Sequence, residues 1–356
     1  MQNPLDARLT SLLLRPHPGG RPDTVAGVVG WFGAMQAQDM ASGLWSLGAR
    51  LPGSTARKVT AALERREAIR TWPMRGTIHL VPPRDAKWML ELMGSRLLVA
   101  ADARRKTLGL TEADSDRGVE LLAGALAGGG RLARAECLRV LSEGGVDVGG
   151  QRGYHILWHA SQQGVTAIGP TVGKDQTFVL LDDWAPDPHR PSREEALTLI
   201  ARWYLRSHGP ATVADLARWT GLTVRDCRAG VAGAGLAEVD RMWLDPALVD
   251  ADLPELDDWL ALPGFDEYML GYKDRSMMLD DAHKEAIVPG GNGVFQATLV
   301  RGGRVVGTWK RSLTRKAVVV TARPLVRFRA ADRRCAEAAL QPYADFVELP
   351  LQVHWT

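Results

Sequence analysis

The sequence predicts an α+β protein in which three repeated units, each made of helices followed by a β-hairpin, precede a β-rich C-terminal domain. Helical periodicity followed by two short strands recurs three times along the chain. Short β-rich runs dominate after Phe265. The length of 356 residues also favours several domains, because single cores stop growing near about 250–300 residues. The predicted domains are residues 1–110, 111–190, 191–250 and 251–356.

The first unit is the loosest of the three. Helices are expected near residues 5–14, 24–33, 43–50 and 55–66, and the segment "AIRTWPMRGTIHLV" is typical of a hairpin. The segment "MQAQD" interrupts the helical pattern between the second and third of these helices.

The second unit has the clearest pattern. A helix is expected over 114–127 with Asp114 or Ser115 as its N-cap, followed by helices over 133–143 and 150–163. The segment "VTAIGPTVGKDQTFVLL" then predicts two strands around a turn. Three helices followed by a hairpin is the winged-helix pattern, a variant of the helix-turn-helix.

The third unit repeats this order in a shorter form. A helix over 193–207 is followed by "TVADLARWTGL", which predicts a helix and a turn at Gly221. The next helix starts at Thr223, and "LAEVDRMWLD" predicts a compact hairpin. The three units are therefore predicted to be tandem winged helices.

The C-terminal domain is expected to form a small antiparallel sheet or barrel, crossed by a helix near 330–340. Its expected strands are "GVFQATLV", "RVVGTW", "KAVVVTA", "LVRFRA" and "FVELPLQVHW". Gly302-Gly303 suits a two-residue type I′ turn, in which both residues need a positive φ. Arg301 and Arg304 would flank a narrow, projecting tip that could enter a DNA groove. A plain surface turn is the equally weighted alternative.

The net charge of +3 conceals a strong asymmetry. Residues 1–110 hold 16 basic and 8 acidic residues (+8), and residues 301–330 hold 9 and none (+9). Residues 111–300 hold 17 and 29 (−12), and the last 26 residues hold 2 and 4 (−2). Two basic blocks around an acidic middle indicate one face for a polyanion.

Several classes of protein are disfavoured by the composition. Three widely spaced cysteines suggest neither a disulfide framework nor a zinc site, so a reducing cytoplasm is expected. The apolar runs are too short to cross a bilayer, and the N-terminus lacks a signal-peptide pattern. The Gly-rich segments lack P-loop spacing, which argues against a nucleotide cofactor. His155 and His159 have metal-ligand spacing without a third ligand, so no metal is expected.

Four motifs, "MQAQD", "TWPMRGTIHLV", "LPGFDEYMLGYKDR" and "VVGTWKR", together resemble the winged-helix DNA glycosylases of the AlkZ/YcaQ family. The resemblance implies three winged helices and a C-terminal barrel around a DNA channel, in a monomer without a cofactor. It implies hydrolytic excision of N7-alkylated purines from double-stranded DNA, including bulky genotoxin adducts and cross-links. Such a protein would be cytoplasmic and nucleoid-associated when bound to DNA. The AlkZ branch carries Gln-x-Gln, which here is Gln36 and Gln38.

The proposed chemistry suits carboxamides. Alkylation at N7 makes the purine a cationic leaving group, so the reaction mainly needs a positioned water and a stabilised cationic sugar. A Gln side chain can both accept from and donate to a water, although it is a poor general base. Both Gln36 and Gln38 can reach one water only if residues 36–38 leave the helix, since alternate side chains align in a strand. Asp39 is expected first as the N-cap of the next helix.

The candidate DNA-binding residues lie on the two basic blocks and are Arg75, Thr77, His79, Arg301, Arg304, Lys310 and Arg311. A hydrogen bond within the first hairpin is the more conservative role for His79. Trp72 and Trp309 are expected in the core. Asp266 and Glu267 are expected to pair with Arg275. Two other functions fit the same basic surface: a non-enzymatic winged-helix regulator, and a protein that sequesters adducts without cutting DNA.

Overall fold

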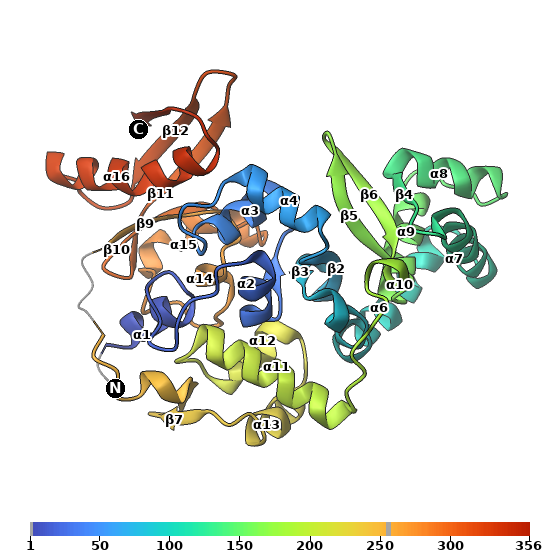
Figure 1. Cartoon of the computed structure of the whole chain (residues 1–356), viewed down its shortest axis with the longest axis horizontal. Helices are drawn as coiled ribbons and strands as arrows, with labels where there is room; N and C mark the ends of the chain where they lie inside the picture. Colours follow the sequence, from blue (N-terminus) through green and yellow to red (C-terminus); the bar gives the residue numbers. More distant parts are fainter. Residues whose placement is uncertain (1–2, 254–257) are drawn as a thin grey trace.

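Residues 3–253 and 258–356 of the computed structural model form a mixed α+β protein, with three β-sheets in these two ranges (Figure 1). Residues 254–257, near the predicted start of the last domain, lie outside the described residues. No described helix is both long and apolar enough to cross a membrane.

The first segment folds as helices and a hairpin, as predicted. Its elements are α1 (Pro4–Ser11), α2 (Val25–Phe32), β1 (Met35–Gln36), α3 (Met40–Gly48), α4 (Ala56–Glu64), β2 (Ile69–Met74) and β3 (Thr77–Val81). Helix α2 ends at Gly33, whose φ of 75° is accessible to glycine without steric cost. The chain therefore leaves the helix before Gln36, as the water-binding hypothesis requires.

A helical stretch that was not expected from the sequence pattern joins the first two segments. It comprises α5 (Ala86–Met89), a π-helical turn (Leu90–Gly94) and α6 (Ser95–Thr107). The second segment then has the expected helices and hairpin. Its elements are α7 (Glu112–Leu126), β4 (Arg131–Ala133), α8 (Arg134–Glu143), α9 (Arg152–Gln162), β5 (Thr166–Val172), β6 (Asp175–Leu180) and α10 (Leu181–Trp184).

The predicted start of α7 is wrong. Thr111, rather than Asp114 or Ser115, is the N-cap of this helix. The Thr111 hydroxyl accepts from the N–H of Asp114, and the Asp114 carboxylate accepts from the N–H of Thr111. This reciprocal capping box places Asp114 inside the first turn.

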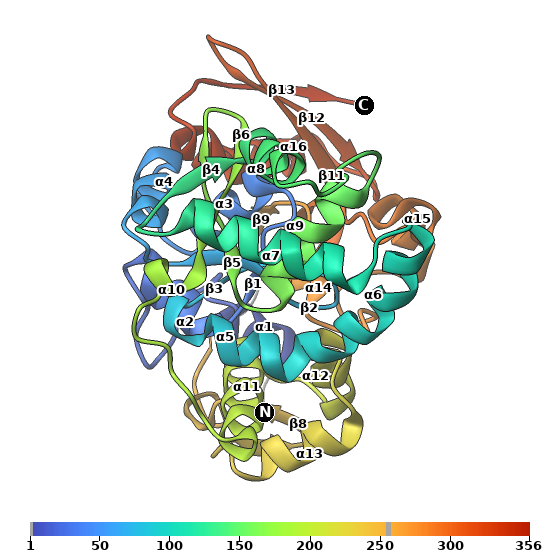
Figure 2. The same ribbon diagram turned by 90° about the vertical axis from the view of Figure 1, so that its right-hand side faces the viewer.

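The hairpins of the first two segments share one six-stranded sheet, with the strand order β1-β3-β2-β5-β6-β4. Arg70 of β2 pairs with Ile168 of β5 at the junction. Figure 2 shows α7, α8 and α9 on the side of the second segment that faces the viewer.

The third segment is compact and has its own two-stranded sheet. It comprises α11 (Arg193–His208), α12 (Val213–Thr220), α13 (Val224–Ala232), β7 (Ala237–Val239) and β8 (Met242–Leu244). Gly221 adopts the left-handed conformation that ends α12, and Thr223 caps α13, as expected.

The C-terminal sheet is open, so the expectation of a barrel is wrong. Its strand order is β13-β12-β11-β10-β9, and β13 joins β12 in parallel. Among the described residues, the edge strands β9 and β13 do not pair with each other, so the sheet does not close on itself. A helix packs on both edge strands, with Leu340 and Tyr343 buried. The described elements are β9 (Trp259–Leu262), α14 (Glu267–Leu270), α15 (Lys284–Ile287), β10 (Ala297–Arg301), β11 (Arg304–Leu313), β12 (Val318–Pro324), α16 (Ala330–Phe346) and β13 (Leu351–Trp355). The predicted strand "LVRFRA" is wrong, because β12 ends at Pro324, directly before this segment, and α16 begins at its last residue; β9 was not predicted.

The turn between β10 and β11 has the predicted backbone, and of the two expected positions it does not take the projecting one. Gly302 and Gly303 have φ values of 53° and 71°. The Gly302 N–H donates to the Asp258 carbonyl at 3.1 Å, and the Tyr268 hydroxyl donates to the carbonyl of the buried Gly303. The tip is therefore anchored to the protein and does not project.

Two groups of buried apolar side chains hold the fold together. The larger contains residues of the first, third and C-terminal segments together with a few from the second segment, such as Val179 and Trp184, and it includes Trp309. The smaller lies mainly in the second segment and includes Trp72 and Ile78 from the β2–β3 hairpin of the first. Both tryptophans are core residues, as predicted. In Figure 1 the first segment lies between the second segment, on the right, and the C-terminal sheet, at the upper left.

Candidate functional site

Three neighbouring strands place polar side chains on one face of the sheet. Gln36 of β1 is paired with His79 of β3, which is paired with Thr71 of β2. Directly paired residues point to the same face, so these three side chains form a row. The hydroxyls of Thr71 and Thr77 are buried without a hydrogen-bond partner among the described residues. This face therefore has unused polar capacity beside Gln36, of the kind that ordered water satisfies.

Gln38 continues the strand pairing with its side chain. The Ala37 N–H donates to the Ile78 carbonyl at 2.8 Å, and the Ile78 N–H donates to Gln38 Oε1 at 3.0 Å. This second bond involves only the Oε1 atom and orients the Gln38 carboxamide. The two N–H groups of the carboxamide take no part in it. Gln36 is only 7% exposed, whereas Gln38 is exposed. The pair thus extends from the interior to the surface.

Asp39 is the N-cap of α3, as predicted. Its Oδ2 accepts from the Ser42 N–H at 3.0 Å and from Arg311 Nη2 at 2.8 Å. Burial alone would raise the pKa of Asp39, but the hydrogen bonds from Ser42 and the charge of Arg311 outweigh it and lower the pKa. An ionised carboxylate tied to a helix end and an arginine is suited to holding the motif in place.

Arg70 anchors the motif from behind. Arg70 is 7% exposed, and its Nη2 donates to the Ala37 carbonyl at 3.0 Å. Burial lowers the pKa of Arg70 to about 10, so it remains a cation at neutral pH. The peptide between Gln36 and Gln38 is thereby fixed to β2.

The carboxylate nearest to Gln36 comes from a distant part of the chain. Glu267 is 1% exposed, and its Oε1 accepts from the Gln36 N–H at 2.9 Å. Its Oε2 accepts from Trp219 Nε1 at 3.0 Å and lies 3.2 Å from His208 Nε2. Burial would raise the pKa of Glu267, but the hydrogen bond and charge of His208 outweigh it and lower the pKa to about 2. Glu267 is therefore a buried negative charge directly behind the motif.

The expected pairing of Asp266 and Glu267 with Arg275 is wrong. Asp266 binds Arg50 through two hydrogen bonds of 2.8 and 3.0 Å, and it also caps α14. Arg275 instead donates from Nε to the Met269 carbonyl. Glu267 is not recognisable as a site residue in the sequence because its partners are remote: Gln36 is 231 residues away.

The β2–β3 hairpin orders three of the candidate DNA-binding residues. Arg75 Nη2 lies 3.1 Å from His79 Nε2, and His79 Nδ1 lies 2.9 Å from the Thr77 carbonyl. Because an arginine only donates, Nε2 is the acceptor and Nδ1 carries the proton. His79 is fully buried, and burial lowers its pKa to about 3. Its conservative role within the hairpin is confirmed, and its place in the interior is out of reach of a phosphate on the surface.

Replacing His79 by a side chain that cannot take up a proton should make the stability of the protein less sensitive to acid. The pKa of His79 is about 3 in the fold against 6.5 for a free histidine, so its stabilisation is complete above pH 6.5 and is lost as pH falls toward 3. The slope from this group is at most about 1.4 kcal/mol per pH unit. His79→Gln should reduce the decline in the free energy of unfolding between pH 6.5 and 4.5, as measured by urea denaturation. An unchanged decline would mean that other groups cause it.

The candidate DNA-binding residues on the C-terminal strands do not lie together in the structure. Arg301 pairs with Asp332 at 2.9 Å and lies over the Trp259 ring, and Arg304 donates to the Met277 carbonyl. Lys310 and Arg311 are adjacent on β11 and so point to opposite faces of the sheet. Of these four residues, only Arg311 reaches the motif.

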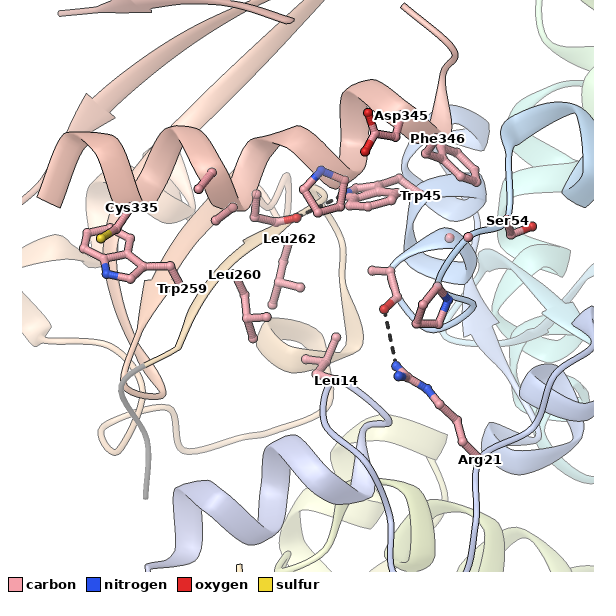
Figure 3. A pocket seen from close by; sticks show the side chains of 18 residues that line it. Leu14, Arg21, Trp45, Ser54, Trp259, Leu260, Leu262, Cys335, Asp345 and Phe346 are labelled. Carbon is pink, nitrogen blue, oxygen red and sulfur yellow. Dashed lines mark hydrogen bonds between the residues drawn. The ribbon is translucent and has the colours of Figure 1, made fainter. Parts of the chain in front are cut away.

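A separate apolar cavity of about 740 Å³ lies between α3, β9 and α16 (Figure 3). Trp45, Leu262 and Phe346 line it, and Trp45 Nε1 donates to the Ala261 carbonyl at 2.9 Å. Neither Gln36 nor Gln38 lines this cavity. Within the described ranges, no group of three or more His, Cys, Asp or Glu side chains is arranged to hold a metal ion.

Chemically, the face of the sheet around Gln36 can bind a neutral water and stabilise a cation. Two carboxamides supply an acceptor and donors, the unpartnered hydroxyls of Thr71 and Thr77 supply further polar contacts, and Glu267 supplies a fixed negative charge. The low pKa and full burial of Glu267 make it a weak base that cannot readily take up a proton at neutral pH.

Comparisons with known proteins agree with each other. The family model described as "DNA glycosylase AlkZ-like" matches residues 29–346. A curated relative from Streptomyces sahachiroi, the "Interstrand DNA cross-link repair glycosylase", is 28% identical over 320 residues, covering 83% of this chain and 84% of that protein. The solved structure of Streptomyces sahachiroi DNA glycosylase AlkZ matches with a TM-score of 0.77 and 26% identity over 98% of both chains.

Proposed function

The chain belongs to the AlkZ-like DNA glycosylase family, and from this membership we propose that it hydrolyses the N-glycosidic bond of N7-alkylated purines in double-stranded DNA. The name of the curated relative supports interstrand cross-links as substrates, and we extend the proposal to bulky guanine adducts that carry the same alkylated purine. The proposed protein is a monofunctional, monomeric enzyme without a cofactor. Its three helix-and-hairpin segments serve as winged-helix units that hold the duplex.

In the proposed reaction, a water oxygen forms a bond to the anomeric carbon as the glycosidic C–N bond breaks. The bonding electrons leave with the alkylpurine and neutralise its positive charge, and the water releases one proton to solvent. Because the base leaves readily, the enzyme gains most by positioning the water and stabilising the oxocarbenium-like sugar.

Gln36 and Gln38 position the water in this proposal, and Glu267 supplies the negative charge that favours a cationic sugar. One observation carries it: the Gln36 N–H is hydrogen-bonded to a buried, ionised carboxylate. A glutamine without a role in catalysis would not require a buried carboxylate at its N–H. Burying a charge is unfavourable unless several contacts compensate it. Asp39 and Arg311 act as positioning residues that hold the end of the motif.

The test is incubation of the protein with a duplex that contains a single N7-methylguanine, followed by chromatography of the released base and alkaline cleavage of the abasic product. We expect free N7-methylguanine and an abasic strand in equal amounts. Borohydride should trap no covalent complex, because a monofunctional enzyme forms no Schiff base. Tight binding to adducted DNA without release would establish sequestration instead. Equal binding to damaged and undamaged DNA without release would favour a regulator.

Adjacent residues on β11 should have separable effects. Arg311→Ala removes the 2.8 Å contact with Asp39, so we expect about a 10-fold slower single-turnover excision, equivalent to about 1.4 kcal/mol. Lys310→Ala is the matched control, since Lys310 is exposed on the opposite face. It should reduce the slope of log Kobs against log salt by about 0.9, the value of one phosphate contact. Excision should be unchanged by Lys310→Ala at saturating protein. A slower excision in both variants would contradict the assigned roles.

A further inference from the structure

We propose that a cationic cavity between α12, α15 and the loop after α14 binds a phosphate group of the DNA backbone close to the reacting nucleotide. The cavity has a volume of about 480 Å³, and Arg218, Lys273, Arg275 and Lys284 contribute to its lining. This inference rests on the proposed function. It assigns the site to residues between positions 111 and 300, the part of the chain that the charge pattern predicts to repel DNA.

Two of these cations are exposed and unneutralised. Arg218 and Lys273 have no carboxylate within ion-pair distance among the residues that the structure describes. Lys284 pairs with Asp281 at 2.8 Å. The two carboxylates of the lining are held by backbone N–H groups, Asp274 by that of Ser276 and Glu285 by that of Gly290. The lining therefore carries an excess of positive charge that an anion can offset.

A third cation is fixed in advance. Arg275 donates from Nε to the Met269 carbonyl, and its guanidinium lies 5.0 Å from the centre of the Phe295 ring. Its Nη2 is buried and has no hydrogen-bond partner among the described residues. An orphaned guanidinium nitrogen is costly unless a ligand or water satisfies it, and a phosphate oxygen accepts well from this fork. Burial lowers the pKa of Arg275 to about 10, and the charge of Arg218 contributes to the shift.

The cavity is also connected with the motif through α12. Trp219, the neighbour of Arg218 on this helix, donates from Nε1 to Glu267 Oε2 at 3.0 Å. The other oxygen of Glu267 accepts from the Gln36 N–H at 2.9 Å. A phosphate bound by Arg218 and Arg275 would therefore lie near the edge of the Gln36 face, where it could fix the position of the damaged strand.

The experiment measures binding to an undamaged duplex, so its result does not depend on glycosylase activity. The wild type, the Arg218→Ala/Lys273→Ala double variant and an Arg117→Ala/Arg139→Ala control are compared by fluorescence anisotropy over a range of KCl concentrations. The control removes the same charge from exposed arginines that pair with glutamates on α7 and α8. Arg275 is left intact because its buried contact supports the fold. Thermal melting checks that all three proteins fold alike.

We expect the slope of log Kobs against log salt to fall by about 1.8 in the cavity variant, the value of two phosphate contacts, and by less than half of that in the control. Equal slopes for the wild type and the cavity variant would overturn the proposal, as would equal losses in the cavity variant and the control. Isothermal titration with inorganic pyrophosphate tests whether the cavity binds a free anion instead of a phosphate group of DNA. Saturable pyrophosphate binding that the cavity variant loses, with DNA binding unaltered, would make this a site for a free anion and would also overturn the proposal.

Discussion

Replacing Gln38 by alanine should slow single-turnover excision of N7-methylguanine by about 100-fold, while the affinity for DNA changes little. The loss of one preorganised polar group that acts in the transition state has this order of magnitude. Affinity should persist because a neutral side chain that orients water contributes little to binding of the ground state. Rapid-quench kinetics with enzyme in excess measure the rate constant, and anisotropy measures the affinity.

The matched control for Gln38 is Gln163→Ala. Gln163 is an exposed glutamine at the end of α9, bonded to His159, in the second segment. We expect its replacement to leave excision at the wild-type rate. A Gln38→Ala protein that excises as fast as this control would remove Gln38 from the mechanism. A proportional loss of affinity and rate would instead make Gln38 a DNA contact.

The second large effect is expected at Glu267. Glu267→Gln keeps the shape of the side chain but removes its charge and places an N–H donor among donors from Trp219 and His208. Breaking such a buried charged network should destabilise the fold by about 3–5 kcal/mol. If the negative charge also favours the cationic sugar, the maximal excision rate should fall by at least about 10-fold in the protein that remains folded.

The Asp266→Asn variant distinguishes the effect of Glu267 on stability from its effect on the excision rate. Asp266 is as buried as its neighbour and binds the buried Arg50, but no contact links it to Gln36. It should destabilise the fold by a similar amount and leave the maximal rate of the folded fraction nearly unchanged. Equal losses of rate in both variants, measured below their melting temperatures, would reduce Glu267 to a structural role.

The pH dependence of stability gives a further check on Glu267. Its pKa is about 2 in the fold and 4.5 as a free side chain. Because the folded pKa is depressed, the stabilisation is fully present above pH 4.5 and is lost as pH falls toward 2. Glu267 therefore remains ionised throughout the neutral range, and excision near neutral pH should not titrate with this group.

The Gln36–Asp39 segment could be predicted from the sequence because its signals are local. Gly33 permits the exit from α2, and Asp39 followed by an apolar helical pattern marks the start of α3. The side chains between them must then alternate, whatever surrounds them. The order of helices and hairpins was predictable for the same reason, since each helix carries its own caps and apolar face.

The surroundings of the motif could not be predicted, because they depend on tertiary contacts. Glu267 has Arg275 as an apparent partner eight positions along the chain, yet the fold places it against Gln36, His208 and Trp219. The same limit applies to the open C-terminal sheet. Alternation identifies most of its strands, but the parallel pairing of β13 with β12 depends on where α16 returns the chain. The anchoring of Gly303 by Tyr268 is likewise invisible in the local turn signal.

The most direct test of the central claim is the single-turnover rate of Gln36→Ala/Gln38→Ala compared with the two single variants on an N7-methylguanine duplex. If both carboxamides position one water, removal of either one already abolishes that function. The double variant should then be about as slow as the slower single variant, because residues that act as a unit give non-additive losses. Losses that multiply would contradict a shared water, and a double variant that excises at the wild-type rate would contradict the assignment of catalysis to Gln36 and Gln38.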